Sequence, residues 1–234
     1  MASPNRRANA DASDVGTFGQ FLRRAGLAGP IEYLFQVIHG LRHPRLLTGG
    51  ATAEERSARL PGDDVVADAS WIRTRAQTVN VSPTRVWPWL AQLGADRGGW
   101  PGWYPFTQPH DTSANQLLGF TIEPGDTLAE VIGPESNARW HVIDLKAPHY
   151  LVLHSCRTLG TGRDVDRSTA RHWADTSWAF ALQPLEGGRT RLLARTRSLV
   201  APRWLGYAVR IIGTGDTVMQ RELLAAIARR AEHG

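Results

Sequence analysis

The sequence has few of the residues on which disulfide and metal chemistry depend. Cys156 is the only cysteine among 234 residues, so neither an intramolecular disulfide nor a cysteine-based zinc cluster is available. No stretch reaches the roughly 18 apolar residues that a membrane span needs. The polar N-terminus does not contain the apolar core of a secretory signal. We therefore expect a cytoplasmic protein without a transmembrane segment.

Lysine is equally scarce. Lys146 is the only one, and arginine supplies the other basic residues of a chain whose formal net charge is +5. The arginines are scattered, with no run longer than Arg229-Arg230, whereas a nucleic-acid-binding face clusters them. The charge favours weak attraction to anions, and we expect no nucleic acid partner.

Metal and cofactor motifs are incomplete. His39 and His43 have the i, i+4 spacing of metal ligands, but a third ligand is not evident and Pro44 ends the stretch. The glycines in 160–162 and 213–215 do not complete a phosphate-binding fingerprint after a strand. We expect no metal and no cofactor.

The N-terminal part of the chain has helical periodicity. Residues 1–14 are small and polar and predict a disordered tail. Residues 15–60 predict a helical extension and linker, in which two amphipathic stretches meet at Gly29-Pro30 and the second ends at His43-Pro44. This extension could pack on the main domain, make a homodimer contact, or act as a lid or membrane-surface anchor.

Residues 61–234 carry the signals of one α+β domain. A strand over 71–81 leads through Ser82-Pro83, an N-cap followed by proline at the first helical position, into a helix ending at Gly94. The stretch 97–106 is rich in glycine, proline and aromatics and predicts an irregular corner. Short strands separated by turn residues then recur. They are predicted over 127–132, 138–146, 150–156, 176–183 and 190–199.

Two helical stretches follow Pro202. Apolar residues from Trp204 to Ile212 define the first, and the glycines of 213–215 break or kink the chain. Asp216 can cap the second stretch, which carries Met219 and Leu223. The domain therefore ends in a long helical segment.

This order of elements resembles the START-like or Bet v 1-like superfamily, also called the polyketide-cyclase-like group, and its bacterial members above all. The residues that carry the resemblance are the helix over 81–94, the Arg97-Gly98-Gly99-Trp100 corner, the strand around 190–197 and the end of the terminal helix over 221–232. The resemblance implies a helix-grip fold. In it, a curved antiparallel sheet of six to seven strands wraps a long C-terminal helix, with two short helices after the first strand.

A helix laid across a curved sheet implies a cavity between them, and that space is the expected site. Its candidate lining residues are aromatics of the corner and strands, one arginine and two apolar residues of the last helix. They are Trp87, Trp100, Trp103, Tyr104, Phe106, Trp140, Trp178, Arg195, Met219 and Leu223.

Candidate acid–base residues are fewer. His110 beside Asp111 follows the corner, and an imidazole next to a carboxylate can move protons. His154 alternates with Val152 and Cys156 on a strand and titrates near neutral pH if it projects inward. No serine sits in a nucleophile elbow.

Three functions fit these observations. The first is binding of a small hydrophobic or aromatic molecule, lipid-like or polyketide-like. The second is a cyclase, aromatase or dehydratase that shapes a natural-product intermediate and moves protons, without a cofactor. The third is an interaction protein that dimerises through its N-terminal helices around a collapsed cavity.

Overall fold

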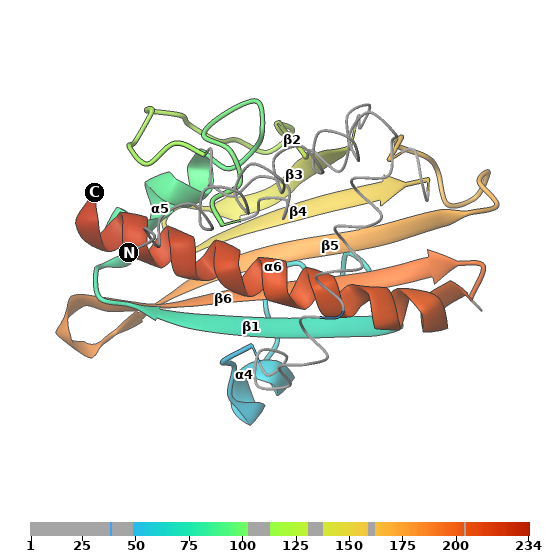
Figure 1. The fold of residues 1–234 in the computed structure, drawn as a ribbon, viewed down its shortest axis with the longest axis horizontal. Helices are drawn as coiled ribbons and strands as arrows, with labels where there is room; N and C mark the ends of the chain where they lie inside the picture. The colour runs from blue at the N-terminus through green and yellow to red at the C-terminus, as the bar shows by residue number, and fades with distance from the viewer. Residues whose placement is uncertain (1–37, 39–48, 103–112, 131–137, 159–161, 204) are drawn as a thin grey trace, which may run out of the picture.

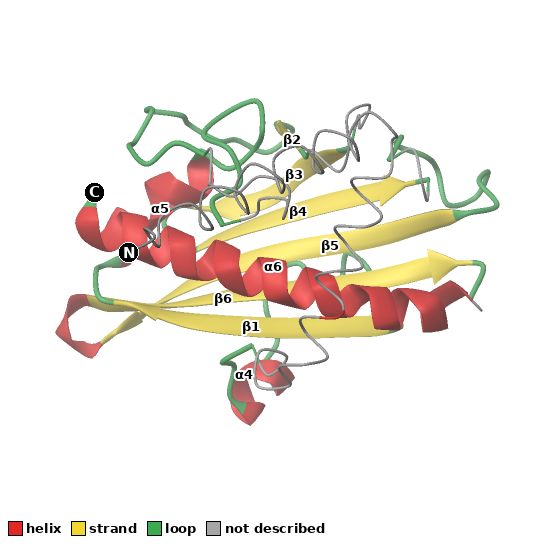
Figure 2. Cartoon of the chain, in the orientation of Figure 1, coloured by secondary structure: helices red, strands yellow, loops and turns green. Residues whose placement is uncertain are grey.

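The structure, a computed structural model, describes residues 38, 49–102, 113–130, 138–158, 162–203 and 205–234, with the backbone alone for 205–218. These residues form an α+β fold in which a long helix lies against one face of a curved sheet (Figures 1 and 2). The elements are α4 (Ala53–Ser57), β1 (Trp71–Val79), α5 (Pro83–Ala91), β2 (Thr127–Ala129), β3 (Arg139–Lys146), β4 (Tyr150–Arg157), β5 (Trp173–Leu185), β6 (Arg189–Ala201) and α6 (Leu205–His233).

The six strands make one open antiparallel sheet in the order β1-β6-β5-β4-β3-β2. All of the strands predicted from the sequence are present, with ends that differ by a few residues. Neighbouring strands follow one another along the chain except for β1, which pairs with β6. Because side chains alternate across a strand, this register assigns each residue of the sheet to one of two faces.

The face toward α6, here called the inner face, carries most of the apolar core. Trp178, Phe180 and Leu182 alternate along β5, as their spacing predicts, and are buried against Leu223 and Ile227 of α6. Complete burial of an apolar side chain of this size contributes about 2 kcal/mol. The inner face therefore anchors the C-terminal half of α6.

The opposite face, here called the outer face, is covered as well. Ala181 of β5 and Leu193 of β6 pack there against Ala51 and Leu60 of the segment that precedes β1. Within this segment, α4 begins with a capping box in which Thr52 and Glu55 exchange backbone and side-chain hydrogen bonds. The linker that precedes the main domain therefore contains one short helix among its described residues.

Three details differ from the sequence prediction. The break over 213–215 is wrong, because α6 runs as one helix from Leu205 to His233. Only α5 follows β1 in the described residues; no second short helix appears in 92–102 or 113–126. Ser82 precedes α5 as expected, but its hydroxyl bonds the Thr84 hydroxyl at 2.8 Å rather than a backbone N–H.

Of the predicted extension, 15–37 and 39–48 lie outside the described residues.

No helix in the described ranges has the length and apolarity needed to cross a membrane.

Candidate functional site

Four large aromatic side chains meet on the inner face. Trp178 of β5 stacks on Trp100 of the corner, with centroids 5.7 Å apart and an interplanar angle of 7°. It also contacts Trp140 at 5.4 Å and Phe180 at 4.9 Å. All four are buried members of the main core. The predicted corner is thus bound to the sheet, and Trp100 Nε1 fixes it by donating to the carbonyl of Ala129 at 2.8 Å.

Glycine lets the same corner approach α6. Gly102 has a φ of +71°, and a Cβ there would stand 2.5 Å from the carbonyl oxygen of Glu222 on the helix. A side chain at this position would therefore meet backbone that cannot move aside. The corner therefore lies directly against α6 at this point.

A buried ion pair lies beside the aromatic cluster. Glu130 is 6% exposed, and its Oε2 accepts hydrogen bonds from Trp140 Nε1 at 3.0 Å and from Arg157 Nη1. The guanidinium of Arg157 also lies 5.1 Å from the centroid of the Trp140 ring. A carboxylate and a guanidinium are thereby held together at the inner face.

Four polar side chains cross the inner face next to the aromatic cluster. In the strand register, Thr176 on β5 stands opposite Ser155 on β4 and opposite Ser198 on β6. Trp71 on β1 stands opposite Ser198 and completes this set, which we call the polar row. Side chains alternate across a strand, so Thr176 shares the inner face with Trp178, which is two residues away. Residues that stand opposite each other share a face, so the whole row lies on the inner face.

Within the described residues, the polar row is hydrogen-bonded at its centre and not at its ends. Thr176 Oγ1 and Ser198 Oγ lie 3.0 Å apart. Ser155 Oγ and Trp71 Nε1 are both buried, and neither has a hydrogen-bond partner among the described residues. Ser155 is 0% exposed. Leaving a hydroxyl buried without a partner costs about 1–3 kcal/mol.

The helix α6 crosses the sheet beside the polar row. Its Gln220 is buried, and Nε2 donates to Thr196 Oγ1 at 2.8 Å. Thr196 lies two residues from Ser198 on β6 and stands opposite Trp178. Of the predicted lining residues on α6, Met219 is half-buried next to Gln220 and Leu223 is part of the apolar core. Trp87 of α5 is half-buried and packs against the same core.

The predicted acid–base residue His154 lies on the other side of the sheet. It stands opposite Ser177 of β5, and its Nε2 is 2.6 Å from Asp175 Oδ1. Asp175 is 3% exposed and is also 3.0 Å from Arg167 Nη1, while Arg167 Nη2 donates to Asp68 at 2.8 Å. His154 thus belongs to a chain of hydrogen-bonded polar side chains on the outer face, away from Trp178 and the polar row.

Two further groups adjoin this chain of polar side chains. His141 stands opposite His154 on β3, and its Nε2 is 2.8 Å from Asp164 Oδ2. Burial, reinforced by the negative charge of Asp175, raises the pKa of the Cys156 thiol to about 11, so the thiol is not activated as a nucleophile. Within the described ranges, no group of three or more His, Cys, Asp or Glu is arranged to hold a metal ion.

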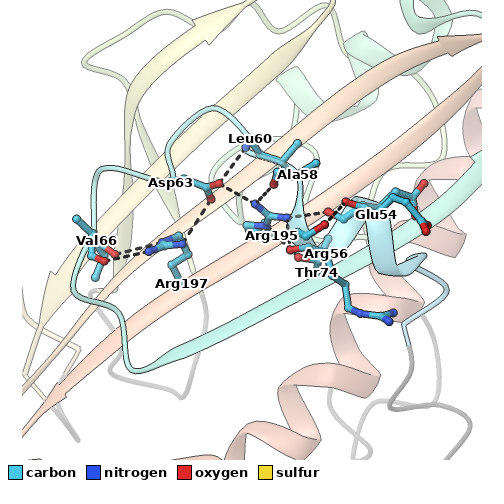
Figure 3. Close-up of polar contacts among 12 residues, drawn as sticks. Glu54, Arg56, Ala58, Leu60, Asp63, Val66, Thr74, Arg195 and Arg197 are labelled. Carbon is cyan, nitrogen blue, oxygen red and sulfur yellow. Dashed lines mark hydrogen bonds and ion pairs between the residues drawn. The ribbon is translucent and has the colours of Figure 1, made fainter.

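Arg195 also faces outward rather than toward α6. Figure 3 shows it beneath the segment that precedes β1. It is 3% exposed and donates to Asp63 Oδ2 at 2.7 Å, to Thr74 Oγ1 at 2.9 Å and to three backbone carbonyls. Those carbonyls belong to Glu55, Arg56 and Ala58 at the end of α4. Arg195 therefore joins β6 to the segment that precedes β1. It lies on the opposite face of the sheet from the predicted lining residue Trp178.

Two neighbouring arginines on β6 also bind the segment that precedes β1. Arg191 donates to both carboxylate oxygens of Glu55, at 2.7 and 2.9 Å. Arg197 donates to the carbonyl of Val66 (Figure 3) and to that of Ala67. Arg195 and Arg197 lie at alternate positions of β6 and share one face of the strand with Leu193. That face is the outer one.

The remaining predicted site residues fall in the corner loop, outside the described residues. They are Trp103, Tyr104, Phe106, His110 and Asp111. Four polar residues of the inner face were not predicted as site residues from the sequence: Ser155, Thr176, Ser198 and Glu130. Alternation from Trp178 could have indicated Thr176, whereas Ser155 and Glu130 become visible only through the pairing of strands.

Comparisons with known proteins identify no family. No family model matches the chain, and no curated protein matches its sequence. Among solved structures, a protein from Arthrobacter aurescens is 18% identical with a TM-score of 0.43, over 70% of this chain and 87% of that one. A hypothetical protein from Helicobacter pylori is 13% identical with a TM-score of 0.43, over 75% and 99%. Similarity at this level assigns neither a family nor a function.

Proposed function

We propose that this protein binds a small hydrophobic or aromatic organic molecule between the inner face of the sheet and α6. The polar row is the observation that carries the proposal. A sheet face that served folding alone would place apolar side chains beneath a helix, as the half next to Leu223 does. Instead, the buried Ser155 hydroxyl stays without a partner in the described residues. A bound molecule would supply that partner.

The proposal includes a helix-grip fold and membership of the START-like superfamily. The support is the resemblance of the corner at Arg97 to Trp100 and of the helix over 81–94, together with the antiparallel order of the sheet and the long helix α6. The aromatic cluster around Trp178 would form the apolar wall of the site, and the polar row its polar wall.

Native mass spectrometry of the purified protein tests the proposal. We expect a co-purified molecule that is released on denaturation, and a saturable site for the dye ANS once that molecule is removed. Ser155→Leu would put an apolar side chain in place of the Ser155 hydroxyl and abolish ANS binding, with far-UV circular dichroism confirming the fold. Ser168→Leu, at an exposed position, is the control and should bind ANS normally. The proposal is overturned if no molecule co-purifies and ANS finds no site.

A cyclase, aromatase or dehydratase is the second candidate, and the Glu130–Arg157 pair favours it. A carboxylate at the inner face can accept a proton, and a guanidinium beside it can polarise a carbonyl. The pair lies near the polar row, because Arg157 and Ser155 are two residues apart on the same face of β4.

Mass analysis of the co-purified molecule before and after incubation with fresh protein tests this second candidate. An enzyme converts it, and Glu130→Gln binds it without conversion. His154→Ala, on the outer face, is the control and should leave turnover unchanged. If the molecule stays unconverted, or if Glu130→Gln converts it at the normal rate, the enzyme reading is wrong.

A further inference from the structure

The ends of the polar row define a hydrogen-bonding pattern that a ligand must match. This step rests on the proposed binding function and names the chemistry of the molecule. Trp71 Nε1 can only donate, whereas the Ser155 hydroxyl can donate or accept. Both groups are buried without a partner in the described part of the chain. Both are also uncharged, so their natural partners are neutral oxygen atoms.

The charged side chains two residues from each end of the polar row already make interactions of their own. Arg157, two residues from Ser155, is bonded to Glu130. Arg73, two residues from Trp71, lies over the Trp71 ring with its guanidinium carbon 5.5 Å from the centroid. A carboxylate brought to the row would lose its hydration and meet the buried carboxylate of Glu130 nearby, which makes a charged ligand unfavourable.

The length of the row sets the size of the ligand. Trp71 and Ser155 are separated by three strand spacings, because Ser198 and Thr176 stand between them. Three spacings amount to about 14 Å, and with a hydrogen bond of about 2.8 Å at each end, ligand oxygens roughly 8–10 Å apart would bridge the row. The centre of the row needs no ligand, since Thr176 and Ser198 bond each other.

We infer that the polar row selects an elongated, uncharged molecule that carries a hydroxyl or carbonyl oxygen at each end of an apolar body. The oxygen at one end accepts from Trp71 Nε1, and the oxygen at the other bonds Ser155 Oγ. Trp71 and Ser155 are then specificity-determining residues. The aromatic cluster of Trp178, Trp100 and Trp140 lies beside the row and contacts the apolar body.

Calorimetric titration with four probes of one shape tests this inference. The probes are biphenyl, 4-hydroxybiphenyl, 4,4′-dihydroxybiphenyl and biphenyl-4-carboxylate. One hydrogen bond is ordinarily worth about fivefold in affinity. We therefore expect affinity to rise about fivefold from biphenyl to the monohydroxy probe and again to the dihydroxy probe. The carboxylate should bind no better than biphenyl.

Variants show whether the row is responsible. Ser155→Ala and Trp71→Phe should each lower the affinity for the dihydroxy probe about fivefold and leave biphenyl binding unchanged. A purely structural defect would weaken both probes together. Ser177→Ala is the matched control, because Ser177 is an equally buried serine on the outer face of the neighbouring strand. It should change neither affinity.

The outcomes separate the two proposals. If none of the four probes binds, the proposed function is contradicted. If biphenyl binds but hydroxyl groups add nothing, if the carboxylate binds most tightly, or if both variants keep the dihydroxy preference, the inference about the polar row is overturned. The proposed function then stands.

Discussion

Ser155 and Thr176 stand directly opposite each other on β4 and β5, yet their hydroxyls are used differently. Thr176 Oγ1 is bonded to Ser198 Oγ across the next strand pair, at 3.0 Å. Ser155 Oγ, completely buried, has no partner in the described residues. The same sheet face thus contains one hydroxyl that contributes to folding and one that costs stability.

Replacing Ser155 by alanine should stabilise the ligand-free protein. The substitution removes a buried hydroxyl whose desolvation is uncompensated, so we expect the free energy of unfolding to rise by about 1 kcal/mol. Chemical denaturation of ligand-free protein measures this change. Ser177→Ala, equally buried on the outer face, should change stability less. A loss of stability in Ser155→Ala would show that the hydroxyl is satisfied in solution.

Arg195→Lys should be strongly destabilising although it keeps the charge. A lysine ammonium cannot reproduce the fork that reaches Asp63, Thr74 and the carbonyls at the end of α4. Because buried acceptors would be left without donors, we expect the free energy of unfolding to fall by about 3 kcal/mol. Urea denaturation measures it, with Arg189→Lys at an exposed position of the same strand as control. Equal stability of the two variants would contradict this role.

The strands could be predicted because their chemistry is local. Alternation of Trp178, Phe180 and Leu182 with smaller residues indicates a strand whatever lies around it. The turn residues between strands likewise act within a few positions. The continuity of α6 could not be predicted, because packing of the helix against the sheet overrides the weak helix propensity of the glycines at 213 and 215.

The face on which a side chain lies was harder to predict than its strand. Alternation correctly groups Arg195 with Leu193, and His154 with Val152 and Cys156, but it does not say what covers each face. Here the segment before β1 covers the outer face, so buried residues occur on both sides. The position of Arg195 therefore became clear only with the tertiary structure.

Acid should weaken the attachment of α4 to the sheet. The hydrogen bonds from Arg191 hold the pKa of Glu55 below its ordinary value of 4.5. The Glu55 carboxylate therefore binds a proton less readily in the folded protein than in the unfolded chain. The pair of Glu55 with Arg191 stabilises the fold above pH 4.5, and this stabilisation is lost as the pH falls through the lowered pKa.

Glu55→Gln should therefore flatten the dependence of stability on pH below about 4.5, where wild-type stability declines. Denaturation curves measured at a series of acidic pH values give that slope. Glu186→Gln, at the exposed turn between β5 and β6, is the control. A slope unchanged by Glu55→Gln would show that the pair with Arg191 does not persist in solution.

The Cys156 thiol should react slowly in the folded protein. Burial, and then the nearby charge of Asp175, raise its pKa from 9.0 to about 11, which lowers the thiolate fraction at pH 8 about a hundredfold. Labelling with Ellman's reagent should be much slower than for the denatured protein, and it should accelerate as the pH is raised toward 11. Asp175→Asn removes the neighbouring negative charge and should speed labelling at pH 8. Asp166→Asn should speed it less, because the Asp166 charge contributes less to the raised pKa of the thiol. Labelling of the folded wild type at the denatured rate would mean that the outer face around His154 and Asp175 is open.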